Sequence, residues 1–373
     1  MVNTEEIHQI YSIPERSAKE AGLHYLLDDM PGYSRMRRGR GFIYKDHNGG
    51  ALKSPDEVSW IKSLRIPPAW KDVWISPIQN AHLLATGRDE RNRKQYIYHP
   101  KWNELRTLLK FYRLILFAEA LPKLRAEIKR GLRRQSLTKQ RTLPREKVLA
   151  AVLSLIDKLS IQVGNDEYAK SNKTYGLTTL LDNHAEINND TVVLHFVGKS
   201  NIRQQMKVKD RNIAQVVKKS KDITGRRLFQ YIDKEQKRHP ITSNEVNEYI
   251  QAIAGYDFTA KDFRTWSASV HAYELMKKEC AACSLANASQ KLRNSKAREI
   301  LAIVAEKLGN TVAVCKAHYV HTDLQEIFSK GEFTHRIGGL PKLKAIKGLS
   351  AIEVEFQYLL AVLYREKVAS FLS

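Results

Sequence analysis

Residues 94–132, KQYIYHPKWNELRTLLKFYRLILFAEALPKLRAEIKRGL, contain the change of pattern that decides the fold class. The first five residues are rich in aromatic and β-branched side chains, which is typical of a strand. From Trp102 onward the apolar side chains recur at intervals of three and four, which predicts a helix, with Pro122 marking a break or a helix start. We therefore expect an α+β protein with a β-rich N-terminal part and a mostly helical C-terminal part.

The segments before this stretch predict a small β-rich domain over residues 41–100. Short runs such as GFIYKD, DVWISP and HLLATG are separated by glycine, proline and asparagine residues that favour turns. Residues 1–40 end in a basic cluster without apolar periodicity, made up of Arg35, Arg37, Arg38 and Arg40. We interpret residues 1–40 as a mobile basic arm that contacts phosphates.

Residues 101–373 predict a second, mostly helical domain with a small sheet. The basic, polar residues 132–145 are the best candidate for a hinge, and residues 146–159 form an amphipathic pattern after it. TVVLHFVG and IRQQMKV indicate two strands joined by a short turn at Lys199–Asn201. Helical patterns then cover residues 212–220, 243–254, 261–278 and 295–308, and a last packing helix is expected at residues 352–372.

Composition restricts the class of partner. The chain has 373 residues, and its 62 Lys and Arg against 40 Asp and Glu leave a net charge of +22. A polyanion that neutralises this charge is the expected partner, and a basic solvated surface is the alternative. The three cysteines, Cys280, Cys283 and Cys315, indicate reduced thiols without a zinc site. The sequence shows neither a signal-peptide pattern nor an apolar run that could span a membrane, so we expect a cytoplasmic protein.

Six segments in a fixed order carry a family resemblance. They read IPPAWKDVWISP, GRDERNRKQYIYHPKW, VGNDEYAKSNKTYGLTTL, HFVGKS, FTAKDFRTW and LGNTVAVCKAHYVH. Together they resemble the type IB DNA topoisomerases of the small bacterial and poxvirus kind, over about residues 41–328. The resemblance implies a two-domain clamp on double-stranded DNA with a tyrosine-recombinase-like catalytic domain, which acts as a monomer and is associated with the nucleoid if the source is bacterial.

The same resemblance implies a reaction and its residues. Tyr319, in CKAHYVH, matches the nucleophile that forms a 3′-phosphotyrosyl intermediate and so conserves the energy of the cut bond. Arg264 matches a guanidinium that holds the non-bridging phosphate oxygens. Lys199 matches the general acid for the departing 5′-oxygen, and Lys261 an accessory basic residue. Relaxation of supercoils then needs no cofactor, neither ATP nor metal, in line with the absence of a Walker A string and of an acidic metal cluster.

Two positions depart from the family pattern. Asn310 stands where the poxvirus members have a phosphate-binding histidine, and its amide can still donate a hydrogen bond. Gln162, in SIQVGN, stands where the first catalytic arginine is expected, and it has neither the charge nor the bidentate fork. The site is then naturally weaker, or filled by a neighbouring basic residue, or deliberately altered. Lys158 is the nearest basic residue, but its place on the preceding helix should direct it elsewhere.

DNA binding is separable from this chemistry. The run GRDERNRKQYIY combines basic residues with tyrosines that would share one face of a strand, and in the family the matching hairpin lies in the DNA groove. The candidate DNA-binding residues are Arg88, Arg91, Arg93, Lys94, Tyr96 and Tyr98. The structural alternative is a charged, exposed hairpin whose tyrosines cover a core.

Two competing functions remain at this level. A tyrosine recombinase shares the phosphotyrosine chemistry, but it usually has an H-x-x-R box where this chain has Lys261-Asp262-Phe263-Arg264. A catalytically impaired DNA-binding protein of topoisomerase descent is the alternative that Gln162 allows.

Overall fold

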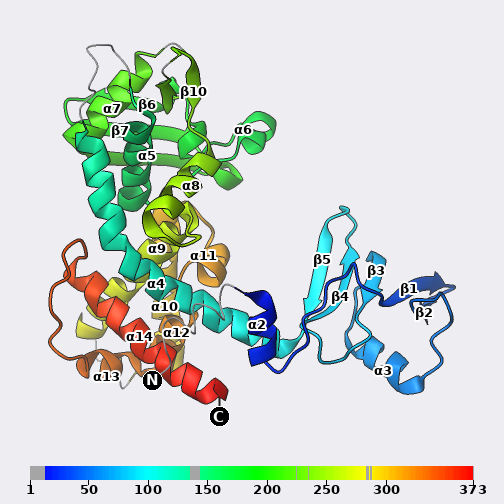
Figure 1. Cartoon of the computed structure of the whole chain (residues 1–373). Coiled ribbons are helices and arrows are strands. Elements are labelled where there is room, and N and C mark those ends of the chain that lie inside the picture. The colour runs from blue at the N-terminus through cyan, green and yellow to red at the C-terminus, as the bar shows by residue number, and fades with distance from the viewer. Residues whose placement is uncertain are drawn as a thin grey trace. The chain divides into compact units, whose positions relative to one another are not determined.

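The computed structural model describes the whole chain except residues 1–12, 135–142, 224, 234, 283–284, 286–287 and 373. The chain divides into two compact units, Met1–Lys110 and Phe111–Ser373 (Figure 1). The first unit is β-rich and the second mostly helical, which confirms the predicted α+β class.

The first unit is built on a five-stranded antiparallel sheet with strand order β2-β1-β3-β4-β5. Its core contains Ile61, Ile66, Val73, Ile75 and Ala85. Two short helices accompany the sheet. The elements are α2 (Pro14–Glu20), β1 (Tyr33–Arg38), β2 (Gly41–Lys45), α3 (Pro55–Ser63), β3 (Lys71–Ile75), β4 (Leu83–Arg88) and β5 (Lys94–Tyr98).

The basic cluster before residue 41 is part of this sheet, which corrects the prediction of a mobile arm for the described residues up to 40. Strand β1 pairs with both β2 and β3. The Arg35 guanidinium donates to the carbonyl oxygens of Ile66 and Pro67, each at 2.9 Å, and lies 4.2 Å from the Phe42 ring centroid. An arginine-rich strand is stable here because the Arg35 side chain donates to carbonyl oxygens far along the chain and packs on the Phe42 ring. Residues 1–12 lie outside the described residues.

Helix α4 (Pro100–Arg133) runs without interruption through Pro122, so the predicted break or start at this residue is wrong. A proline inside a helix costs about 3 kcal/mol because it removes one hydrogen bond and crowds the preceding turn. Around it, Phe117, Ala118, Leu121 and Leu124 are completely buried. Their packing offsets the local cost. The helix ends at Arg133 and α5 begins at Arg145, so most of the expected hinge at 132–145 lies outside the described residues.

The second unit contains a three-stranded antiparallel sheet, ordered β6-β7-β8, and a two-stranded sheet of β9 and β10. Helix α5 is buried along nearly its whole length and packs against α7, α8 and α9. The elements of this part are α5 (Arg145–Leu159), α6 (Asp166–Asn172), β6 (Ala185–Asn188), β7 (Thr191–Val197), β8 (Arg203–Lys209), α7 (Arg211–Lys221), β9 (Gln230–Ile232) and β10 (Arg238–Pro240). The predicted strands and their turn at Lys199–Asn201 are confirmed.

The remaining helices pack around α9, which contacts α5, α10, α12 and α14. They are α8 (Ser243–Ala254), α9 (Ala260–Ala282), α10 (Gln290–Leu308), α11 (Val312–His318), α12 (Thr322–Lys330), α13 (Phe333–Gly338) and α14 (Ala351–Leu372). In Figure 1, α11 lies near α9 and α10, and α6 projects from the part of this unit that carries the sheet. The helices predicted from periodicity are confirmed. Among the described helices, none is long and apolar enough to cross a bilayer.

A partly buried charged cluster joins α14 to α4, α5 and α9. Arg125 forms ion pairs with Asp157 and Glu353, each at 2.9 Å, and the Trp266 indole donates to Glu353 at 3.0 Å. Burial acts to raise the pKa of Glu353, but hydrogen bonds from Arg125, the Ser350 backbone and Trp266 outweigh it and lower the pKa to about 2. Helix α9, which also carries Arg264, is therefore held by a charged anchor.

Candidate active site

Tyr319 follows directly after α11 and is held in place by α9. Thr311, directly before α11, caps this helix with its side chain by accepting from the Val314 amide. The buried Ser269 hydroxyl on α9 donates to the Tyr319 carbonyl at 2.9 Å and accepts from the His321 amide at 3.1 Å. One side chain thus fixes the backbone at the tyrosine and directly after it.

Arg264 lies on the same helix and is 2% exposed. Its guanidinium donates to the carbonyl of Leu308 at 3.1 Å and to that of Ser160, and its Cζ lies 5.1 Å from the Tyr319 ring centroid. Ser160 ends α5 in the left-handed conformation, with φ 55°, and Leu308 ends α10. Burial lowers the pKa of Arg264, with the neighbouring Tyr319 partly opposing. Two helix ends therefore fix a charged group beside the tyrosine.

Two hydrogen-bond donors in this region are buried without a partner. They are Arg264 Nε and Asn310 Nδ2, two of the four such side-chain atoms among the described residues. Buried donors are rarely left unpaired, because each costs about 1–3 kcal/mol. A fixed cationic donor beside a tyrosine, with a second buried amide donor in the segment just before α11, is the kind of donor set that binds an anionic oxygen.

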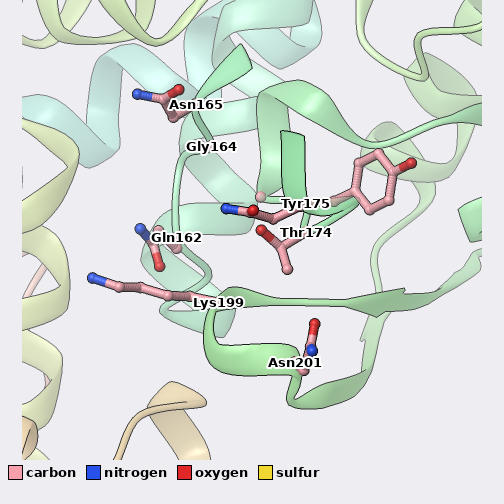
Figure 2. Close-up of a pocket in the computed structure, with 9 residues that line it drawn as sticks. Gln162, Gly164, Asn165, Thr174, Tyr175, Lys199 and Asn201 are labelled. Carbon is pink, nitrogen blue, oxygen red and sulfur yellow. The ribbon is translucent and has the colours of Figure 1, made fainter. Parts of the chain in front are cut away.

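Gln162 and Lys199 lie together at a second part of the site, a pocket of about 590 Å³. In Figure 2 their side chains extend next to each other from different segments. Both are exposed. Lys199 begins the turn between β7 and β8. The other lining residues are uncharged: Gly164, Asn165, Asn172, Thr174, Tyr175, Gly176 and Asn201. Lys199 is therefore the only cation among the residues that line this pocket.

The backbone around Gln162 is fixed by a close approach of two glycines. A Cβ at residue 176 would lie 2.6 Å from the Gly164 Cα, and Gly164 has a φ of +115°. The Gln162 carbonyl accepts from the Leu177 amide at 2.8 Å. As expected, Lys158 points elsewhere, since it pairs with Asp210 at 2.5 Å.

Lys261 lies on α9 one turn before Arg264, with an exposed side chain. The start of this helix is anchored by Arg113, which forms ion pairs with Asp257 and Asp262, each at 2.7 Å. Asp262 also accepts from the Thr259 amide at 2.8 Å. The position of Lys261 is therefore set by the same helix that positions Arg264.

The candidate DNA-binding residues share the β4–β5 hairpin of the first unit. The rings of Tyr96 and Tyr98 stack with centroids 5.7 Å apart, which confirms their common face. Several of the cations have carboxylate partners that the sequence did not reveal. Lys94 pairs with Asp28 at 2.6 Å, Arg93 with Asp89 at 2.7 Å and Arg88 with Asp72 at 3.9 Å. Arg91 is exposed, and no ion pair of it is found within the described part of the chain.

Two of the three cysteines lie within the described residues. Cys280 is a partly buried free thiol and Cys315 a buried one, while Cys283 lies outside the described residues. Cys315 is one helical turn before Tyr319. Burial raises the pKa of its thiol to about 11, with Arg264 opposing.

Sequence reasoning missed Ser160 and Ser269, because no local pattern separates them from the other serines.

Comparison with known proteins identifies the family. Residues 99–334 match the model for the catalytic core of eukaryotic DNA topoisomerase I, and residues 41–89 match that for the N-terminal domain of bacterial DNA topoisomerase IB. DNA topoisomerase 1B of Acanthamoeba polyphaga mimivirus is 30% identical over 303 residues, covering 80% of this chain and 88% of the relative. DNA topoisomerase 1B of vaccinia virus (strain Western Reserve) is 22% identical over 302 residues, covering 79% and 89%. The chain belongs to the type IB DNA topoisomerase family.

Proposed function

We propose that this enzyme relaxes supercoiled DNA by cutting and resealing one strand of a duplex, with Tyr319 as the nucleophile. The phenolate attacks the scissile phosphorus, the bond from phosphorus to the 5′-oxygen breaks, and the 5′-oxygen leaves as a hydroxyl after taking a proton. The same hydroxyl attacks the phosphotyrosine in reverse and releases Tyr319. Because the covalent intermediate conserves the bond energy, the cycle needs no ATP.

The observation that carries this proposal is the unpartnered, buried Nε of Arg264, whose guanidinium lies beside the Tyr319 ring; the amide of Asn310, just before α11, is a second buried donor without a partner. In the proposed reaction, Arg264 and Asn310 bind the non-bridging oxygens of the phosphate, where negative charge accumulates in the transition state. Lys261 adds positive charge from the exposed side of α9. Lys199 supplies the proton to the departing 5′-oxygen.

Gln162 makes this site weaker than one with an arginine there. No other basic residue lines the pocket beside Lys199, which favours the weakened-site interpretation over a replacement by a neighbour. Loss of one charged donor typically slows a reaction by about 10²–10³. A catalytically impaired DNA-binding protein is the second candidate, and Gln162 is the observation that favours it.

DNA is held, in this proposal, by the β4–β5 hairpin among other basic surfaces. Arg91 reaches phosphates without competition, whereas Arg88, Arg93 and Lys94 exchange a carboxylate for a phosphate. Tyr96 and Tyr98 present a stacked face to the groove. Because one active site cuts one strand, a monomer is sufficient for the reaction. The enzyme acts on chromosomal DNA, in the cytoplasm or on the nucleoid of a bacterial source.

Plasmid relaxation tests the proposal. The wild-type chain should relax supercoiled plasmid in EDTA without ATP and should form a covalent 3′-adduct with a labelled duplex. Tyr319→Phe should lose both while its duplex affinity stays within a few-fold, because only the nucleophile is removed. Tyr358→Phe is the matched control, since Tyr358 is exposed on α14 and should leave activity unchanged.

The outcomes separate the alternatives. A covalent adduct recovered from Tyr319→Phe removes this residue from the reaction. Binding without relaxation by the wild-type chain indicates an impaired binding protein. Recombined plasmid products indicate a recombinase.

A further inference from the structure

The proposed acid and the proposed nucleophile come from different segments. Lys199 lies on the turn between β7 and β8, whereas Tyr319 and Asn310 lie around α11. In the proposed reaction Tyr319 attacks the phosphorus atom from one side, and Lys199 protonates the oxygen that leaves on the opposite side. A displacement of about 1 Å in such a site can cost about 10² in rate. The turn that carries Lys199 therefore has to be fixed against the segment after α10.

The side chain of Gln204 makes this connection. Gln204 lies on β8, opposite Phe196 in the register. A Cβ at residue 309 would overlap with the amide nitrogen of Gln204 and would lie 2.8 Å from its Cδ and 2.9 Å from its Oε1. A Cβ at residue 198 would lie 3.3 Å from its Cγ. One side chain therefore packs on Gly198, directly before Lys199, and on Gly309, directly before Asn310.

Gly309 is suited to this contact in two ways. It ends α10 in the left-handed conformation with φ +62°, which favours glycine. It also leaves no side chain between the backbone and the Gln204 amide. The Gln204 amide fills the space that a Cβ at residue 309 would need, so the contact depends on both residues and not on Gln204 alone.

We propose that Gln204 is a positioning residue for the proposed general acid: by packing on Gly309 it holds the Lys199 turn at a fixed distance from Asn310 and Tyr319. This inference rests on the proposed function, because it assumes that Lys199 protonates the departing oxygen. Gln204 itself touches no reacting atom in this account. It acts through the strand and turn that carry Lys199.

The chain offers a matched control at the next residue. Gln205 has the same side chain on the same strand, but successive residues of a strand point to opposite faces. Gln205 is exposed and pairs with His195 across the ladder. Gln205→Ala therefore removes an equal side chain from β8 without touching Gly309.

A substrate that needs no acid separates positioning of Lys199 from general damage. If sulfur replaces the 5′-bridging oxygen of the scissile phosphate, the leaving group is a thiolate. An alkyl thiol ionises with a pKa of about 8.5, far below that of an alcohol, so it departs without a proton. Single-turnover cleavage is measured on the oxygen and the sulfur substrate for Lys199→Ala, Gln204→Ala and Gln205→Ala.

We expect Lys199→Ala to slow cleavage of the oxygen substrate by about 10²–10⁴, the usual contribution of a general acid. Gln204→Ala should slow it by about 10². On the sulfur substrate both should recover to within a few-fold of the wild type, and Gln205→Ala should match the wild type on both. Gln204→Met, which restores the length of the side chain over Gly309, should regain most of the rate. Gln204→Thr, which suits a strand, replaces the alanine variant if that one does not fold.

The following results overturn the inference. Gln204→Ala that is as fast as the wild type, or equally slow on both substrates, shows that Gln204 does not position the acid. Gln204→Met as slow as Gln204→Ala contradicts the packing account. If sulfur rescues Lys199→Ala but not Gln204→Ala, only this inference fails. If sulfur does not rescue Lys199→Ala, the acid assignment in the proposed function is itself wrong, and the inference fails with it.

Discussion

The two parts of the candidate site are built differently. Around Tyr319, the groups are buried and fixed: Arg264 is bound to two carbonyls, and Ser269 holds the backbone of the tyrosine segment. Around the pocket, Gln162 and Lys199 are exposed, and it is the backbone beneath them that is fixed. A buried side chain with several partners cannot be exchanged without loss of structure, whereas an exposed one can. This explains how the fold accommodates glutamine at 162, and it predicts opposite behaviour for substitutions in the two parts.

The largest effect is expected for Arg264. Arg264→Lys should reduce single-turnover cleavage by about 10³, because lysine lacks the fork that binds two carbonyls and an oxygen together. It should also lower the melting temperature, since two buried carbonyls lose their donor. Cleavage and thermal unfolding measure the two losses. A variant with normal cleavage and a normal melting temperature would contradict the fixed, buried role.

Gln162→Arg tests the exposed part with the opposite sign. It should increase single-turnover cleavage by about 10²–10³, corresponding to about 3–4 kcal/mol of transition-state stabilisation. Stability and duplex affinity should barely change, because the side chain is exposed and many other basic residues hold the DNA. Gln205→Arg adds the same charge on β8 and serves as the control. A neutral or harmful result for Gln162→Arg removes the weakened-site hypothesis.

The ion pair of Glu353 with Arg125, which anchors α9, predicts that the free energy of unfolding depends on pH. The pKa of Glu353 is lowered from 4.5 to about 2, so its contribution to stability is complete above pH 4.5 and is lost as the pH falls towards 2. The shift corresponds to about 3 kcal/mol. Urea unfolding between pH 7 and pH 3 measures it, and Glu353→Gln should flatten the curve. Glu366→Gln, which alters an exposed ion pair with Arg336, should leave the curve unchanged.

A smaller effect is expected for Ser269. Ser269→Ala removes the donor to Tyr319 and the acceptor for His321, and we expect cleavage to slow by about tenfold, equivalent to about 1.4 kcal/mol. Ser267→Ala on the same helix is the comparison, because its hydroxyl contacts Ser160 instead. Equal rates for Ser269→Ala and the wild type would show that the tyrosine segment is positioned by other contacts.

The smallest effect concerns the hairpin in the first unit. Arg91→Ala should reduce the slope of log affinity against log salt by about 0.9, the value for one phosphate contact. Arg93→Ala should reduce it by less, because Asp89 already neutralises part of its charge. Titrations of a short duplex at several salt concentrations measure both slopes. Equal changes for the two arginines would show that the pair with Asp89 opens on binding.

The sequence predicted the elements whose patterns are local. The amphipathic stretch at 146–159 is α5, and the two runs beside Lys199 are β7 and β8, because periodicity reports the face that an element buries. Strand β1 was missed because Arg35 finds its partners at residues 66–70, far along the chain. Pro122 was misjudged because the packing that keeps α4 continuous is tertiary.

The candidate residues could be predicted from sequence motifs, but the contacts that surround them could not. Arg264, Asn310 and Tyr319 could be named from the sequence, but the carbonyls of Ser160 and Leu308 that bind Arg264 come from two other helices. The contact of Gln204 with Gly309 joins a strand and a helix end that lie about a hundred positions apart. Such pairs follow from the fold, and a single sequence has no signal for them.

The burial of Cys315 has a consequence for chemical selectivity. The thiolate is the reactive form of a cysteine, and this thiol lies one helical turn from the tyrosine. With a pKa of about 11, about one Cys315 thiol in 10⁴ is ionised at pH 7. The thiol beside the proposed nucleophile is therefore almost entirely in its unreactive, protonated form. For the same reason an alkylating reagent at neutral pH should modify the partly exposed Cys280 faster than the buried Cys315.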